Sequence, residues 1–243
     1  MADSPSNWQP PWLQLPGESR ALIEWLRKPH AQAHPEWPQG QGIPVLVIPG
    51  FGQSAKSTTP LRKLLKAQGF VPYDWAQGRN MGLKSGMTAA LLKLISTLHE
   101  KHQHKLALIG WSLGGIFARE MARREADAVR QVITLGSPIQ DSDHTTIDAL
   151  FRLLNPGTPA RTPPEQRAAR SRPPAVPCTA IYTRSDGIVP WRAALEPAAP
   201  HTRNVRVRGS HMGLPANPQV WRACAEALAT PLPRPGGAKT GTA

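Results

Sequence analysis

The sequence has few cysteines and lacks the common metal and nucleotide motifs. Only two cysteines occur in 243 residues, Cys178 in an apolar run and Cys224 in a helical pattern. So few cysteines argue against a disulfide framework, and we expect two packed thiols. The His-Glu-x-x-His pair, paired-cysteine zinc spacing, the Gly-x-x-x-x-Gly-Lys phosphate loop and the dinucleotide fingerprint are all missing. We therefore expect no metal and no organic cofactor.

Long apolar segments are also missing. No run of about 18 apolar residues occurs, so we expect no membrane-spanning helix. The first residues, "MADSPSNWQPPW", carry acidic Asp3 where a secretory signal carries positive charge, and no apolar segment of about 7 to 15 residues follows. We expect a soluble protein of the cytoplasm.

Acidic residues are scarce, with 16 Asp and Glu against 29 Lys and Arg, which gives a formal net charge of +13. Such a charge favours contact with nucleic acid, anionic lipid or acidic substrates, although a solvated arginine-rich surface explains it equally well. Nucleic acid is the weaker alternative, because no zinc-finger spacing, aromatic RNA-binding signature or block of five basic residues occurs. Five arginines fall within residues 139–177: Arg152, Arg161, Arg167, Arg170 and Arg172. We expect them to favour anionic lipids or a phosphate-bearing acyl carrier.

Short apolar runs punctuate the chain. Four of them are nearly continuous, as is typical of parallel strands with helices on both faces. They span residues 43–50, 105–112, 130–138 and 178–186. Residues 204–211 alternate between apolar and polar, which predicts an edge strand, and residues 69–75 are a weaker sixth candidate.

Helical patterns separate these runs. One helix is predicted to begin with Thr59 as cap and Pro60 in the first turn, and the last with Asn217 and Pro218. Between them lie an apolar stripe from Met87 to Leu98 and a helix directly after Ser112. Alternating strands and helices predict an α/β fold with a mostly parallel sheet of about six strands and right-handed crossovers.

The chain length fits one domain of this kind. Residues 1–42 hold four of the eight tryptophans and a predicted helix at about 19–28, and we expect this extension to pack on the core. Residues 43–230 form the α/β domain. Within it, residues 139–177 are a long excursion of the kind that covers an active site or is disordered, with a helical pattern near 147–154. Residues 231–243 are predicted to be a disordered tail.

The stretch "GWSLG" at residues 110–114 carries the strongest chemical signal. A strand that turns abruptly into a helix places a serine on a strained backbone, and the residues two before and two after it must be small. Gly110 and Gly114 meet this requirement, an apolar strand precedes Ser112, and an amphipathic helix follows it. Ser112 is therefore the predicted nucleophile, with a buried turn serine as the alternative.

A serine nucleophile needs a base and a carboxylate that orients the base. His211, in "RGSHMGL", is the only histidine at the end of a predicted strand, and Asp186 ends the strand before it. The chain order serine, aspartate, histidine supports Asp186, because a serine that follows a strand in such a turn has its partners later in the chain in this order. Alternatives are His144 and His201 for the base, and Asp141 and Asp143 for the acid.

When a serine attacks an acyl carbon, a tetrahedral oxyanion forms, and it needs hydrogen-bond donors; we look for two. The backbone N–H of Leu113 follows the nucleophile at a helix start, and the Phe51 N–H lies in the glycine-rich loop "PGFG" after an early strand. The alternative for this loop is a simple glycine turn.

The segments "IPGFG", "GWSLGG", "LGSP", "SDGIVPW" and "GSHMG", in this order, resemble the α/β-hydrolase superfamily and its bacterial lipases and esterases. The resemblance implies Ser112, Asp186 and His211 as catalytic triad, Phe51 and Leu113 as oxyanion hole, and a cap at residues 139–177. It also implies eight strands in the full form. Residues 1–42 do not read as the two leading strands, so we expect a reduced sheet, and Pro49 replaces a histidine that many lipases carry.

The expected function is hydrolysis of a carboxylic ester or thioester with an apolar acyl chain, through an acyl-enzyme. Partners are then a small-molecule ester or lipid and an anionic lipid surface. Two alternatives stay open at this point: an acyltransferase that uses the same triad, and a binding protein on the hydrolase fold without catalysis.

Overall fold

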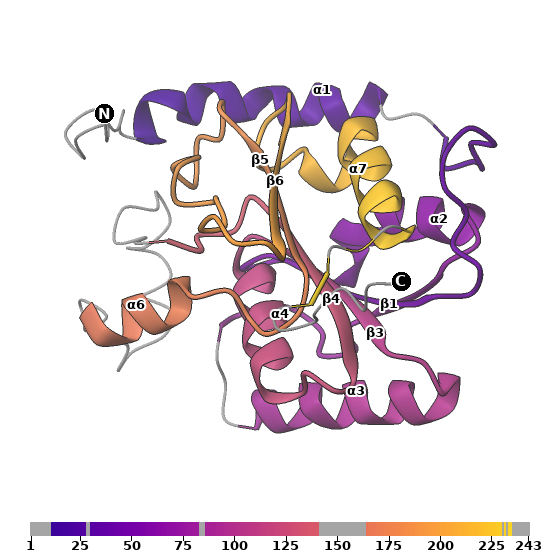
Figure 1. Ribbon diagram of the computed structural model, residues 1–243. Coiled ribbons are helices and arrows are strands. Elements are labelled where there is room, and N and C mark those ends of the chain that lie inside the picture. The colour runs from indigo at the N-terminus through magenta and orange to yellow at the C-terminus, as the bar shows by residue number, and fades with distance from the viewer. Residues whose placement is uncertain are drawn as a thin grey trace, which may run out of the picture.

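The computed structural model describes residues 11–27, 30–82, 86–140, 164–229, 231, 233 and 234. A six-stranded parallel sheet forms its centre, in the order β2-β1-β3-β4-β5-β6 (Figure 1). The strands are β1 (Pro44–Ile48), β2 (Val71–Asp74), β3 (Leu106–Trp111), β4 (Val129–Leu135), β5 (Cys178–Thr183) and β6 (Thr202–Val207). Each apolar run of the sequence supplies one strand, and β6 lies at the sheet edge, as its alternating pattern predicts.

Helices cover both faces of the sheet, which explains why β1 and β3 are apolar throughout. Val45 and Val47 of β1 belong to the core cluster with helices α2 (Thr59–Ala67) and α7 (Pro218–Ala229). Leu46 and Ile48 face the other way, toward α3 (Met87–His102) and α4 (Leu113–Arg124). Figure 1 shows α3 and α4 on one side of the sheet and α2 and α7 on the other.

Two details of the helices differ from the sequence-based expectation. The N-cap of α2 is Thr58 rather than Thr59, and it makes no side-chain capping bond, so Thr59 is the first helical residue with Pro60 next to it. The second difference is α6 (Pro164–Ser171), which forms in the Pro- and Arg-rich stretch where no helix was predicted. Residues 141–163 of the expected cover, including the helical pattern at 147–154, lie outside the described residues.

The N-terminal segment consists of a 3-10 helix, η2 (Pro11–Ser19), and helix α1 (Arg20–Arg27). It lies at the carboxyl ends of β5 and β6, where α1 crosses the top of the view in Figure 1. The Trp25 indole N–H donates to the Met212 carbonyl at 3.0 Å, and Arg20 donates to the Ser185 carbonyl at 3.1 Å. Leu22, Ile23 and Leu26 on the outer side of α1 are exposed.

Both cysteines are buried free thiols. Burial raises the pKa of each thiol well above its usual value, so neither Cys178 nor Cys224 is poised for thiolate chemistry. Among the described helices, none is both long and apolar enough to cross a membrane.

Candidate active site

Ser112 occupies a sharp turn between β3 and α4. Its backbone angles, φ 54° and ψ −122°, lie in a region that residues with a side chain rarely adopt. A Cβ on Gly110 would overlap the backbone of Gly114, and a Cβ on Gly114 would overlap the backbone of Ile48. The turn therefore requires glycine on both sides, and it presents the Ser112 side chain at the carboxyl edge of the sheet.

Asp186 and His211 follow the neighbouring strands β5 and β6, and their side chains meet. The distance between Asp186 Oδ2 and His211 Nδ1 is 2.7 Å, and both residues are almost completely buried. Asp186 Oδ1 accepts the backbone N–H groups of Ile188 and Val189 at 2.9 and 2.7 Å. One carboxylate oxygen is thus fixed by its own loop while the other orients the imidazole.

The electrostatic surroundings of His211 favour its charged form. Burial of the imidazole alone would lower its pKa, but the Asp186 charge and hydrogen bond and the Glu18 charge outweigh burial, and the pKa of His211 is raised. A base of this kind accepts a proton readily when it starts neutral.

Gly136, the residue after β4, lies directly against this pair. Its φ of 55° is left-handed, and a Cβ there would lie 3.1 Å from both Asp186 Oδ2 and His211 Nδ1. The sequence motif "LGSP" contains this glycine, but nothing in its local pattern indicated a contact with the aspartate and histidine. Only a residue without a side chain leaves the pair its full space.

Glu18 of η2 joins the two loops that carry Asp186 and His211. Its carboxylate accepts three backbone N–H groups at 2.9 Å each, those of Gly187, His211 and Met212. Glu18 cannot be identified from the sequence, because these contacts connect distant parts of the chain and leave no local pattern.

Glu24 of α1 also binds the loop that carries Ser210 and His211, which we call the histidine loop. It accepts the backbone N–H of Ser210 at 3.0 Å and the Ser210 hydroxyl at 2.5 Å. A Cβ on Gly213 would overlap the Glu24 carboxylate, so the loop closes around this side chain. The N-terminal segment therefore contacts the histidine loop.

Asn80 fixes the glycine-rich loop after β1. Its side-chain amide donates to the Pro49 carbonyl at 2.7 Å, and its backbone carbonyl accepts the Gly52 N–H at 2.6 Å. A Cβ on Gly50 would lie 3.2 Å from Cβ of Ser112, so the loop packs against the serine turn. Asn80 is fully buried, and it was also not identified from the sequence.

A cavity of about 280 Å³ opens between these elements. It is lined by Gly50, Phe51, Gly52, Gln53, Met81, Trp111, Ser112, Ile188, His211 and Met212. Ser112, His211 and Phe51 thus face one space, and Leu113 is the first residue of α4 beside it. His211 is the only ionisable group among the described lining residues, so the cavity suits an uncharged, mostly apolar group.

Of the alternative acid and base residues, His201 alone lies in the described part of the chain, and it does not line this cavity. His201 precedes β6 at the opposite end of that strand from His211. Asp141, Asp143 and His144 lie outside the described residues, as do Arg152 and Arg161. In the part of the chain that the structure describes, no group of three or more His, Cys, Asp or Glu residues could hold a metal ion.

Comparison with known proteins defines the family. The model of the alpha/beta hydrolase family matches residues 45–237. The chain belongs to the alpha/beta hydrolase family.

Single relatives are more distant. A pimeloyl-[acyl-carrier protein] methyl ester esterase of Aliivibrio salmonicida is 28% identical over 99 residues, which is 41% of this chain and 38% of that protein. The monoacylglycerol lipase of Paleococcus ferrophilus is similar in structure, with a TM-score of 0.58, 18% identity, and 79% of this chain and 96% of that chain covered. A thioesterase domain from the curacin biosynthetic pathway is also similar in structure, with a TM-score of 0.52 and 15% identity; the match covers 82% of this chain and 93% of that chain. At these identities the structural likeness shows the fold.

Proposed function

We propose that this protein is a serine hydrolase that cleaves carboxylic esters or thioesters with an apolar acyl group. The observation that carries the proposal is the hydrogen-bonded Asp186–His211 pair, with His211 and the strained Ser112 on one cavity. The ester-cleaving relative named above supports the same reaction class.

In the proposed mechanism the Ser112 hydroxyl oxygen attacks the acyl carbon while His211 Nε2 takes its proton. Asp186 holds the imidazole through Nδ1 and stabilises the imidazolium that forms. The backbone N–H groups of Leu113 and Phe51 donate to the oxyanion. When the tetrahedral intermediate collapses, His211 gives its proton to the departing alcohol or thiol.

Water completes the reaction by the same steps. His211 takes a proton from a water molecule, the hydroxide attacks the acyl-enzyme, and the second collapse returns the proton to Ser112 and releases the carboxylic acid. An alcohol or amine in place of this water would make the protein an acyltransferase.

The cavity indicates an acyl group of modest size. Its volume is about 280 Å³, close to the smallest volumes typical of small-molecule pockets, about 300 Å³. The apolar side chains of Met81, Ile188 and Met212 line it. We infer a short or medium acyl chain rather than a long one.

We also propose that the protein takes its substrate from an anionic lipid surface. The exposed leucines Leu22 and Leu26 lie on α1, the helix that also ties the histidine loop, and the chain carries a net charge of +13. Apolar side chains on a cationic protein are typical of contact with the lipid headgroup region. Vesicle flotation tests this location. If anionic vesicles carry no more of the protein with them than neutral vesicles do, the substrate does not lie in an anionic lipid surface.

Two measurements test the reaction. Wild type, Ser112→Ala and the exposed-surface control Ser96→Ala are given p-nitrophenyl esters and matched thioesters of increasing acyl length. We expect Ser96→Ala to keep wild-type turnover and Ser112→Ala to lose it by more than about 10³-fold. Equal rates for Ser112→Ala and wild type would refute the nucleophile.

A fluorophosphonate probe then separates an enzyme from a binding protein on the same fold. Labelling at Ser112 requires an activated hydroxyl, so folded protein that resists the probe would favour the binding protein. Product analysis with added alcohol acceptors separates hydrolysis from acyl transfer.

A further inference from the structure

A second cavity, larger than the one at Ser112, lies at the edge of the sheet opposite the catalytic side. It encloses about 750 Å³ at the amino ends of β1, β3, β4 and β5, between the 38–44 loop and the end of α7. Arg130 in this cavity and Gly136 beside the catalytic pair mark the two ends of β4, which places them about 20 Å apart at about 3.3 Å per residue. The cavity is therefore separate from the serine site.

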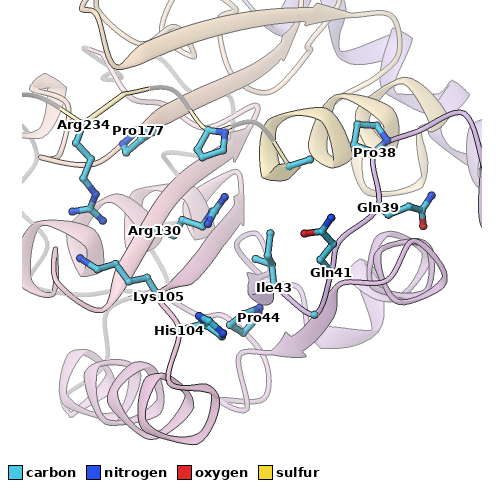
Figure 2. A pocket seen from close by; sticks show the side chains of 13 residues that line it. Pro38, Gln39, Gln41, Ile43, Pro44, His104, Lys105, Arg130, Pro177 and Arg234 are labelled. Atoms are coloured by element: carbon cyan, nitrogen blue, oxygen red, sulfur yellow. The ribbon is translucent and has the colours of Figure 1, made fainter. Parts of the chain in front are cut away.

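The charged side chains of this cavity have one sign. Lys105, Arg130 and Arg234 line it together with His104, and among the described lining residues none is acidic. Figure 2 shows the three cationic side chains on one side of the cavity, with Gln39 and Gln41 on the other. Cations gathered around a concave space whose described lining holds no carboxylate favour an anionic ligand.

Arg130 carries the argument further than charge alone. Its Nε is buried from solvent and has no hydrogen-bond partner among the described residues. A buried guanidinium N–H without an acceptor is costly. Solvent does not reach Nε itself, so an anion in the cavity would bind Arg130 through the terminal nitrogens of the guanidinium, whose charge is not paired by any described residue. Arginine is also the side chain best suited to bind phosphate or carboxylate through two parallel bonds.

The neighbouring cations are anchored without being neutralised. Arg234 donates to the carbonyls of Ala126 and Val129, at 3.3 and 2.6 Å, which holds the guanidinium in place but leaves its charge. Lys105 lies 3.9 Å from the fully exposed Asp127, and a pair so exposed contributes little. Both charges therefore add to the field that a bound anion would meet.

We propose that this cavity binds a small organic phosphate, with the phosphate group on Arg130, Lys105 and Arg234. The volume is far larger than one phosphate and lies within the range of small-molecule pockets, about 300 to 1,000 Å³. Ile43, Pro44 and Pro177 provide apolar wall for the organic part. A single carboxylate would leave most of the positive charge unpaired.

The test is calorimetric titration with phenyl phosphate, inorganic phosphate and benzoate at low ionic strength. We expect phenyl phosphate to bind more tightly than either of the other two, because only it has both a dianionic group and an apolar part. Tightest binding by benzoate would overturn the phosphate assignment. Absence of measurable binding by all three would overturn the site.

Charge variants locate the binding. Arg130→Gln should raise the Kd for phenyl phosphate by about tenfold or more, because the variant loses a charge-assisted hydrogen bond to the phosphate. The control Arg206→Gln removes the same charge from an exposed position on β6 and should leave the affinity unchanged. Equal weakening by the two variants would mean diffuse attraction to a basic surface and would overturn the proposal.

A third variant and an activity assay complete the design. Should Arg130→Gln fold poorly by circular dichroism, Lys105→Gln, which changes a partly exposed side chain, takes its place with the same expected direction. Neither residue touches the serine site, so ester hydrolysis by these variants should equal that of wild type. Loss of hydrolysis in Ser112→Ala with intact phosphate binding keeps the two proposals independent.

Discussion

The carboxylate of Glu18 accepts the backbone N–H of His211 at 2.9 Å, although the two residues are separated by most of the chain. The same carboxylate holds Gly187, the residue after Asp186, so one side chain fixes both loops relative to each other. Because hydrogen bonds to a charged acceptor are the stronger ones, Glu18 does more than fill space. Its charge also contributes to the raised pKa of His211.

Replacing Glu18 with glutamine keeps the shape of the side chain and removes its charge. We expect kcat to fall by about tenfold with little change in KM, because the histidine loop is held less precisely. The acid limb of the kcat/KM profile should move to lower pH, since the Glu18 charge raises the pKa of His211. Steady-state kinetics across pH measures both effects.

The control for this variant is Glu36→Gln, the same chemical change at an exposed glutamate that lies beside His34. It should alter neither kcat nor the pH profile. A shift of the profile that is equal in the two variants would mean a general effect of net charge rather than positioning of His211 by Glu18.

The pH dependence of wild-type activity follows from the raised pKa of His211. The imidazole must be neutral to accept the Ser112 proton, so kcat/KM should rise with pH through a midpoint above the usual value for histidine, about 6.5. In Asp186→Asn the raising charge is gone and burial remains, so the midpoint should move down while kcat falls by about 10⁴-fold. A midpoint in Asp186→Asn at or above that of wild type would contradict this account.

The sheet could be predicted from the sequence because its signal is local. Each run such as "IPVLVIPG" is apolar on both faces, and parallel strands between two helical layers require that pattern. The pairing of Asp186 with His211 is predictable from the sequence for a related reason. Residues that follow two neighbouring parallel strands reach the same sheet edge. Ser112 is predictable separately, from the motif "GWSLG" at residues 110–114.

The supporting residues could not be predicted in this way. Glu18, Glu24 and Asn80 act through contacts with backbone groups of distant loops, and a backbone N–H has no sequence signature. Helix α6 was missed because proline and arginine in its segment indicated irregular chain. In the structure Pro164 stands at the first position of α6 and Glu165 in its first turn, where both residues are favourable.

Gly136→Ala tests whether the space beside the catalytic pair is required. The added Cβ would lie 3.1 Å from Asp186 Oδ2 and His211 Nδ1, so we expect kcat to fall at least tenfold as the pair shifts. Gly78→Ala is the matched control, because Gly78 also has a left-handed φ, of 71°, but open space at the Cβ position. Both variants should lose about 1 kcal/mol of stability from backbone strain. Gly136→Ala should lose more, because its Cβ would also lie 2.8 Å from Leu214 Cδ1, and only this variant should lose activity.

Asn80→Ala tests the loop that carries the Phe51 N–H. The variant removes the donor to the Pro49 carbonyl and leaves that buried acceptor unpaired, at a cost of about 1 to 3 kcal/mol in unfolding free energy. If the loop then moves away from Ser112, one oxyanion donor is lost and kcat should fall by about 10²-fold. Fluorophosphonate labelling separates the causes. Labelling of folded Asn80→Ala should slow in proportion to kcat, because the probe also develops charge on an oxygen held by these donors, whereas loss of turnover with wild-type labelling would place the role of Asn80 in substrate binding.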